Sequence, residues 1–199
     1  MIVLGLTGSI GMGKSVTTRL FSEEGVPTAS ADEIVHALYA GKAAPLIEAA
    51  FPGTMKGHTV DRIALSTAVL DDPQAMQRLE SIIHPLVRVE EQAFVERQRA
   101  AGRPLALIDI PLLFETGAET RVDKIVVVSC APALQRARVL ARPGMTVEKF
   151  EAILAHQLSD EEKRARADFV IETDHGIEPA RTQVRRIVET LRKEARRED

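Results

Sequence analysis

The sequence predicts an α/β protein in which helices cover a parallel sheet. Several runs of strand length are apolar throughout and rich in β-branched residues, for example KIVVVS at 124–129. A strand that is apolar at every position is buried on both faces, which is typical of a parallel sheet between helical layers. Stretches with helical periodicity lie between these runs. This alternation predicts right-handed crossovers within one sheet.

The elements follow one another in a regular order. An apolar strand opens the chain, a glycine-rich loop follows it, and a helix follows the loop. The later helices are amphipathic, since their apolar residues recur every three or four positions. The expected strands are 2–7, a weaker one at 26–30, 105–110, 124–129 and 169–172, and the clearest expected helices are 14–24, 31–40 and 181–193.

Two long stretches without strand character interrupt this pattern. The first, between Asp32 and the strand at 105–110, has helical periodicity and is too long for a simple crossover. The second, 133–168, is helical and charged and is broken at RPGM, residues 142–145. We expect helical insertions at both places. The mixed-charge end RKEARRED, residues 192–199, is expected to fray.

Composition excludes several classes of protein. The chain has 199 residues and is 45% hydrophobic, so it is expected to form about one globular domain. Its formal net charge of -3 gives no overall positive electrostatic field that would attract nucleic acid or an anionic membrane. The scattered aromatic residues offer no platform on which bases could stack. No signal peptide is evident, and no apolar run approaches the roughly 20 residues of a membrane span, so we expect a cytoplasmic protein. The single cysteine, Cys130, is expected to be a small core residue.

The loop after the first strand carries the strongest functional signal. Residues 8–15, GSIGMGKS, match the P-loop pattern between a strand and a helix. Glycines let backbone N–H groups surround phosphate oxygens, and the helix N-terminus adds partial positive charge. Lys14 is expected to reach the β- and γ-phosphates of a nucleoside triphosphate and Ser15 to bind Mg²⁺. The expected nucleotide contacts here are Gly8, Ser9, Ile10, Gly11, Met12, Gly13, Lys14, Ser15 and Val16.

A P-loop alone does not define a reaction, because switches, motors and kinases share it. GTPase switches read their base with an Asn-Lys-x-Asp motif, and this chain contains no asparagine. Motors and helicases normally have a larger body. A small-molecule kinase therefore fits best.

Further motifs resemble those of the dephospho-CoA kinase family. These are GLTGSIGMGKS at 5–15, ADEI at 31–34, IIHPLV at 82–87, DIPLLFETG at 109–117, RVLAR at 138–142 and ADFVI at 167–171, so that the resemblance spans about residues 2–176. The pair HPL and PLLFE is specific to this family among P-loop kinases. The resemblance implies a three-layer fold with a five-stranded parallel sheet, and transfer of phosphate from ATP to the ribose 3′-hydroxyl of dephospho-CoA, giving CoA and ADP. It also implies one domain, 1–199, made of a core (about 1–32, 104–135 and 165–199), a helical substrate-binding insertion (about 33–103) and a lid (about 136–164).

Asp32 is the first candidate for the catalytic base. It follows the second expected strand, where a carboxylate can accept the proton of the attacking hydroxyl, and it matches the position of the family's base. The alternative is that Asp32 caps the helix that begins near Glu33. The family usually has a second aspartate two residues earlier, whereas this chain has Ser30.

The end of the strand at 105–110 offers a second group of candidates. Asp109 lies where an acid can hold Mg²⁺ through water, although an aspartate before Pro111 is also typical of a turn. The apolar residues after it belong either to the core or to the wall of the substrate cleft, and the resemblance favours the wall. Glu115 is expected to orient neighbouring groups. The substrate-binding residues expected in this segment are Pro111, Leu112, Leu113, Phe114 and Glu115.

Arginines in the second insertion are expected to neutralise the transferred phosphate. Arg138 and Arg142 are four residues apart, hence on one helix face, before RPGM breaks the helix; the alternative is a solvated arginine-rich helix. We assign catalysis to Asp32, Lys14 and Arg142, with in-line transfer under the two cations.

The remaining candidates depend on the resemblance. It implies that Arg62 and His84 contact the substrate, although a surface salt bridge and a packed or capping histidine are the alternatives. Thr173 stands where the family usually has an asparagine near the adenine, and Gly176 follows in the same motif. A nucleoside or nucleoside-monophosphate kinase and a non-catalytic nucleotide-sensing adaptor remain as alternative functions. The expected partners are ATP with Mg²⁺ and dephospho-CoA, and the chain is expected to be a monomer or a small homo-oligomer.

Overall fold

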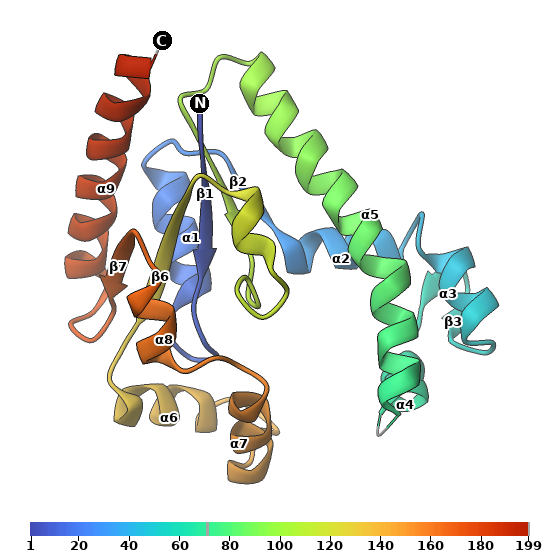
Figure 1. Cartoon of the computed structure of the whole chain (residues 1–199). Coiled ribbons are helices and arrows are strands. Elements are labelled where there is room, and N and C mark those ends of the chain that lie inside the picture. The colour runs from blue at the N-terminus through green and yellow to red at the C-terminus, as the bar shows by residue number, and fades with distance from the viewer. Residues whose placement is uncertain (71, 199) are drawn as a thin grey trace. The chain divides into compact units, whose positions relative to one another are not determined.

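A computed structural model describes residues 1–70 and 72–198 of the chain (Figure 1). Its central sheet has five strands in the order β2-β5-β1-β6-β7. The pairs β1–β5, β1–β6 and β6–β7 are parallel, which confirms the predicted sheet. The strands are β1 (Ile2–Thr7), β2 (Thr28–Ser30), β5 (Leu105–Asp109), β6 (Lys124–Ser129) and β7 (Phe169–Glu172).

The register of the sheet brings two functional segments to one edge. Every residue of β1 is buried, as its continuous apolar sequence predicts. Leu6 of β1 lies opposite Asp109 of β5, and the N–H of Ile110 donates to the carbonyl of Leu6. Because both strands run in the same direction, the P-loop after β1 and the carboxylate of Asp109 emerge side by side.

Two helices cover one face of the sheet. Helices α1 (Lys14–Glu23) and α9 (Ile177–Glu198) pack against each other and against alternate residues of the strands, such as Leu4 and Val126. The opposite face is covered by the segment after β5. There, atoms of Leu113 and Val122 lie 2.6 Å and 3.0 Å from where a Cβ on Gly5 would stand, so β1 is sandwiched between layers.

The C-terminal end of α9 differs from the expectation. We expected residues 192–199 to fray, but α9 continues to Glu198, and residue 199 lies outside the described residues. Leu191 and Ala195 are buried in the main core. They continue the helical spacing of Val184 and Val188. Packing of this apolar face therefore keeps the charged residues from 192 onward helical.

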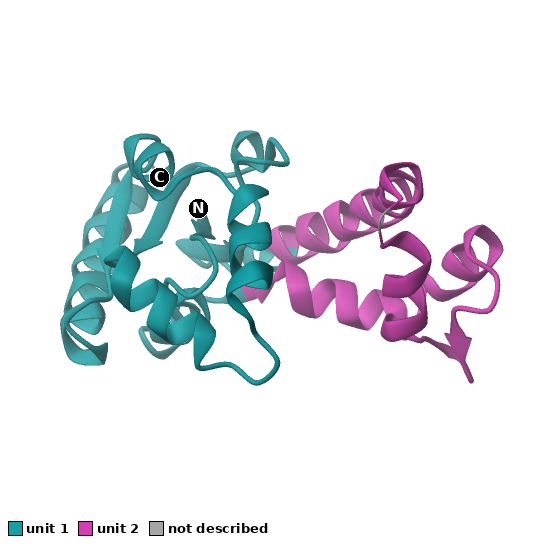
Figure 2. Ribbon diagram, turned by 90° about the horizontal axis from the view of Figure 1, so that it is seen from below, with its two compact units in different colours: residues 1–28, 97–199 teal, residues 29–96 magenta. Residues whose placement is uncertain are grey.

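The contacts divide the chain into two compact units, residues 1–28 with 97–199 and residues 29–96 (Figure 2). The second unit has a core of its own that includes Leu38, Ile47 and Leu65. It contains α2 (Ala31–Tyr39), α3 (Ala44–Ala50), β3 (Met55–Lys56), β4 (Thr59–Val60), α4 (Arg62–Val69) and most of α5 (Pro73–Ala100).

The second unit contains a hairpin that sequence reasoning missed. We expected no strand between Asp32 and residue 105, but β3 and β4 pair antiparallel, with Met55 opposite Val60. Gly57 has a φ of +65° in the two-residue turn between them. A two-residue loop with a glycine at positive φ is typical of a tight hairpin, and strands this short leave no periodic signal.

The remaining helices belong to the first unit. They are η1 (Ala118–Arg121), α6 (Pro132–Leu140), α7 (Val147–Ala155) and α8 (Asp160–Ala165). Among the helices that the structure describes, none is long and apolar enough to cross a membrane.

Candidate active site

The P-loop has the backbone geometry that its glycines predict. Gly11 and Gly13 have φ values of +82° and +102°, a region that other residues rarely adopt. A Cβ on Gly11 would also stand 2.5 Å from a methyl carbon of Val139 in α6. Only glycine fits this position, because a side chain would meet both the strained backbone and the neighbouring helix.

Several backbone donors of the loop are free. Within the described part of the chain, the N–H groups of Gly11, Gly13, Lys14 and Ser15 have no hydrogen-bond acceptor. Lys14 and Ser15 are the first residues of α1, where the N–H groups of a helix lack partners within the helix. Free donors at a helix N-terminus form a site for an anion such as phosphate. The side chain of Ser15 is exposed beside them.

Lys14 and Asp109 form an ion pair at the mouth of this loop. The Lys14 Nζ atom lies 2.5 Å from Asp109 Oδ1, and the Thr18 hydroxyl donates to Asp109 Oδ2 at 2.8 Å. The side chains of Lys14 and Asp109 are only 15% and 5% exposed. Asp109 is therefore more than a turn-forming residue, because it holds the P-loop lysine and α1 at the end of β5.

A second network holds the far side of the P-loop. The Thr173 hydroxyl donates to the Met12 carbonyl at 2.7 Å and accepts from Arg138 Nη1 at 2.9 Å. Arg138 Nη2 donates to the carbonyl of Thr173 at 2.8 Å. Cys130 is buried against Met12, as expected of a core residue, and burial raises the pKa of its thiol. Thr173 and Arg138 thus brace the loop backbone, and their direct contact with the nucleotide stays a prediction.

Arg138 and Arg142 do not share a helix face, so this expectation was wrong. Helix α6 ends at Leu140, and Arg142 lies in the turn that follows, where its N–H donates to the carbonyl of Val139. Pro143 and Gly144, whose φ is +74°, prevent the helix from continuing. Arg142 is exposed, whereas Arg138 is half-buried against Thr173.

The segment after Asp109 is mostly interior. Leu113 is fully buried and Phe114 is 6% exposed, so these two side chains belong to the core rather than to the expected cleft wall. The sequence could not separate the two interpretations, because both require apolar residues. Leu112 is 38% exposed and remains a wall candidate, and the carbonyl of Pro111 accepts from the Thr7 hydroxyl.

Glu115 joins this segment to α8 and the loop before it. Its Oε1 lies 2.9 Å from the fully buried Nζ of Lys163 and accepts from the N–H of Leu158 at 2.8 Å. Burial by itself raises the pKa of the Glu115 carboxyl, but the Lys163 ammonium and the backbone N–H groups hold it below its ordinary value of 4.5. Nearby, the Arg166 guanidinium lies 4.2 Å from the centre of the Phe114 ring, which adds a cation–π contact.

The expected substrate residues of unit 29–96 lie on its helices. Asp32 is the second residue of α2 and is exposed. It does not cap the helix, because Ser30 does so by accepting from the N–H of Glu33 at 3.4 Å. Ser30 therefore has a structural role at the position of the family's usual first aspartate. A serine is among the preferred N-cap residues.

The structure shows where Arg62 and His84, the other two expected substrate residues of this unit, lie. Arg62 is the exposed first residue of α4, and its charge opposes the rise in the pKa of Tyr39 that burial causes. His84 is half-buried in the interior of α5, which continues through Pro85, so it does not cap a helix. Substrate contact by these two residues stays a prediction.

Comparison with known proteins identifies the family. The family model described as dephospho-CoA kinase matches residues 2–179. The chain belongs to the dephospho-CoA kinase family. It is 60% identical to the dephospho-CoA kinase of Agrobacterium fabrum over 191 residues, which cover 96% of this chain and 98% of that protein. It is 56% identical to the dephospho-CoA kinase of Rhodopseudomonas palustris over 199 residues, the full length of both.

Solved structures share the fold of this chain. A Thermus thermophilus protein superposes on this chain with a TM-score of 0.82 at 32% identity. The match covers 95% of this chain and 96% of that protein. The dephospho-CoA kinase of Campylobacter jejuni, with the same coverage, has a TM-score of 0.67 at 24% identity. The second likeness shows the fold alone. As a member of the dephospho-CoA kinase family the chain is an enzyme, so the relatives do not support a non-catalytic adaptor.

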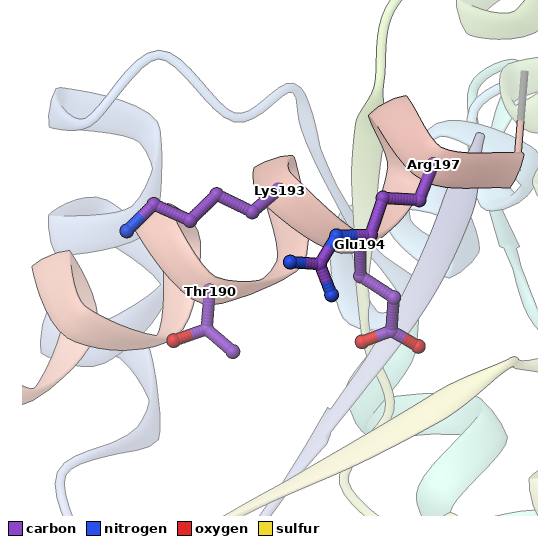
Figure 3. Close-up of a pocket in the computed structure, with 4 residues that line it drawn as sticks. All are labelled: Thr190, Lys193, Glu194 and Arg197. Carbon is purple, nitrogen blue, oxygen red and sulfur yellow. The ribbon is translucent and has the colours of Figure 1, made fainter.

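Two hollows on the surface lie outside the region expected for this family's chemistry. One, of about 440 Å³, is lined by Thr190, Lys193, Glu194 and Arg197 (Figure 3). All four belong to α9, and side chains of one helix face cannot enclose a ligand. The other, of about 290 Å³, continues along α9 to Phe169 of β7. Neither includes a P-loop residue, so we assign them no role in catalysis.

Proposed function

We propose that the residues described above phosphorylate the ribose 3′-hydroxyl of dephospho-CoA with ATP, giving CoA and ADP. The observation that carries this proposal is the set of free backbone donors at the start of α1, beside the Lys14–Asp109 pair. Phosphoryl transfer needs positioning and neutralisation of charge more than covalent catalysis, and these groups supply both.

The P-loop holds the triphosphate in this mechanism. The free N–H groups of Gly11, Gly13, Lys14 and Ser15 donate to phosphate oxygens in this mechanism. The flanking residues Gly8, Ser9 and Val16 complete the loop. Asp109 holds the Lys14 ammonium at the loop mouth, and in this proposal the ammonium contacts the β- and γ-phosphates once the nucleotide binds. The pairing keeps the cation in place before the nucleotide arrives, which reduces the reorganisation that transfer requires.

Asp32 accepts the proton of the attacking 3′-oxygen. As an exposed carboxylate at the start of α2 it has no partner to displace among the described residues of its unit. The geometry that aims it at the hydroxyl then comes from bound dephospho-CoA, which Arg62 and His84 contact in this proposal. Leu112 and Pro111 provide apolar contact, and Glu115 orients their segment through Lys163.

Mg²⁺ fits the oxygen groups near the P-loop. In the part of the chain that the structure describes, no cluster of three or more acidic, histidine or cysteine side chains can hold a metal ion. Magnesium commonly keeps several waters and uses one or two protein groups together with phosphates. The Ser15 hydroxyl and, through water, the Asp109 carboxylate would hold it. When bound, it neutralises charge on the phosphates.

We propose that residues 136–164 form a lid and that 33–103 form the substrate-binding insertion of a single kinase domain. Arg142 supports the lid, because its exposed guanidinium lies in a turn after α6 and is available to the transferred phosphate. Closure would add charge and exclude water, which limits hydrolysis of ATP. Thr173, Gly176 and Arg138 would contact the nucleotide from the end of β7 and from α6. We place the reaction in the cytoplasm, where ATP is supplied, and expect a monomer or small homo-oligomer.

The test is a reaction of the purified protein with ATP, Mg²⁺ and dephospho-CoA. Mass spectrometry of the product should show one added phosphate, located at the ribose 3′-oxygen. The same assay with nucleosides and nucleoside monophosphates is the control. Release of ADP with one of these acceptors and not with dephospho-CoA would contradict the proposal and support a nucleotide kinase.

A further inference from the structure

The P-loop residue Ile10 is held from two sides by glutamines. The backbone N–H of Ile10 donates to Oε1 of Gln157 at 3.1 Å. The carbonyl of Ile10 accepts from Nε2 of Gln135 at 2.8 Å. Neither glutamine is marked by a motif, because each lies in a charged helical stretch of the sequence.

The two glutamines differ in burial and in the elements that carry them. Gln135 is 6% exposed in α6, which lies so close to the P-loop that Gly11 has no room for a side chain. Gln157 is half-buried in the connection between α7 and α8. The adjacent Leu158 is tied through its N–H to Glu115. The bond of Gln157 to Ile10 therefore joins this connection to the P-loop.

The bond of Gln157 occupies an N–H group next to the free donors of the loop. The neighbouring groups of Gly11, Gly13, Lys14 and Ser15 are free in the described part of the chain, whereas that of Ile10 is occupied. A bonded Ile10 N–H fixes the orientation of its peptide unit at the point where the loop turns toward the free donors. Preorganised donors act more strongly than donors that must first turn toward their ligand.

We propose that Gln157 is a positioning residue for phosphoryl transfer, which fixes the Ile10 peptide and thereby links the α7–α8 connection to the shape of the P-loop. This inference rests on the proposed function for its catalytic consequence. Its structural part, the bond between Gln157 and Ile10, is measurable without activity.

The decisive variant is Gln157→Met, which keeps the length of the side chain but has no carbonyl acceptor. Amide hydrogen exchange of Ile10, followed by NMR on the full chain, should become about tenfold faster, as expected for one lost hydrogen bond. With ATP, Mg²⁺ and dephospho-CoA, kcat for transfer should fall. Hydrolysis of ATP relative to transfer should rise, because the P-loop and the α7–α8 connection are no longer joined.

Two further variants separate positioning from general stability. Gln157→Glu keeps an oxygen acceptor and should retain slow exchange of Ile10. Gln183→Met is the matched control, because Gln183 also bonds a backbone, donating to the carbonyl of Glu172 and accepting from its N–H at the edge of β7. It should leave the exchange of Ile10 and the ratio of hydrolysis to transfer unchanged.

Unchanged Ile10 exchange in Gln157→Met, or an equal change of the ratio in Gln183→Met, would overturn the inference. If Gln157→Met does not fold, Gln157→Asn, whose amide is one carbon shorter, is tested with the same readouts. Failure of the wild-type protein to phosphorylate dephospho-CoA would refute the proposed function instead, and the exchange comparison would still decide whether Gln157 fixes Ile10.

Discussion

The P-loop binds phosphate in the proposed reaction, and the start of α2 carries the proposed base. The two regions differ in how many contacts fix their functional groups. Backbone groups of the P-loop are bonded by Gln135, Gln157 and Thr173, and Lys14 is paired with Asp109. Asp32, in contrast, is exposed on the first turn of α2. The site for phosphate is thus formed before any ligand binds, whereas the proposed base is held only by its helix.

Different physical demands explain this contrast. A loop that keeps several N–H groups free must be fixed by other contacts, since otherwise those groups would turn toward water or toward backbone carbonyls. An exposed carboxylate needs no such support, because water stabilises its charge until the substrate arrives. Mutations near the P-loop should therefore reduce stability, whereas mutations of Asp32 should reduce activity alone.

The largest expected effect is on activity and comes from Asp32→Asn. Loss of the base should lower kcat by about 10²- to 10⁴-fold, while the KM for ATP changes little. The free energy of unfolding should stay within about 0.5 kcal/mol of the wild type, as for most exposed positions. Steady-state kinetics and urea unfolding measure these quantities, with Glu33→Gln as the control. Equal losses in kcat and in ATP affinity would instead assign Asp32 to nucleotide binding.

The largest expected effect on stability comes from Lys163→Met. It leaves the Glu115 carboxylate buried without its cation, which should reduce the free energy of unfolding by about 3–5 kcal/mol at pH 7. Thermal and urea unfolding would measure the loss. The exposed Lys149→Met, from α7, is the control and should change little.

The pH dependence of this loss has a definite sign. In the wild type the pKa of Glu115 is lowered, so its stabilising contribution is present above pH 4.5 and is lost as the pH falls through the lower, folded value. Without Lys163, the pKa of Glu115 is higher than in the wild type because the lowering effect of the ammonium is lost, so the variant gains relative stability on protonation. The difference between variant and wild type should therefore shrink from pH 7 to pH 4. A difference independent of pH would show that the lost packing of the lysine, and not its charge, is responsible.

Thr173→Val should have an intermediate effect. It removes the hydroxyl that bonds the Met12 carbonyl and Arg138, which should reduce the free energy of unfolding by about 1–3 kcal/mol. The KM for ATP should rise, while the preference for ATP over GTP stays the same. Thr190→Val on the exposed face of α9 is the matched control. A changed preference without loss of stability would assign Thr173 to adenine recognition, as the sequence resemblance implies.

The smallest expected effect comes from Arg62→Gln. Because Arg62 is exposed at the start of α4, its loss should leave unfolding unchanged. The KM for dephospho-CoA should rise by about tenfold, corresponding to one lost hydrogen bond to a charged group. The exposed Lys56→Gln in the same unit is the control. An unchanged KM would show that Arg62 does not contact the substrate.

Some of the candidate site was predictable from sequence because its residues follow directly from strand ends. The P-loop follows β1, and Asp109 ends the neighbouring strand β5, so a parallel sheet brings Lys14 and Asp109 together. The closeness of the two residues follows from the sheet, whereas the ion pair between their side chains was found only in the structure. The end of α6 before Arg142 was less predictable, because four-residue spacing fits a helix until Pro143 and Gly144 stop it.

The sequence by itself determined the parallel sheet and the P-loop, because apolar runs and glycine spacing are local patterns tied to backbone conformation. Only the tertiary structure decided which side chains hold the loop. Gln157 lies 147 residues from Ile10, and Thr173 lies 161 residues from Met12. A hydrogen bond between residues so far apart in sequence depends on the tertiary packing that brings them together, and a local sequence pattern does not determine that packing.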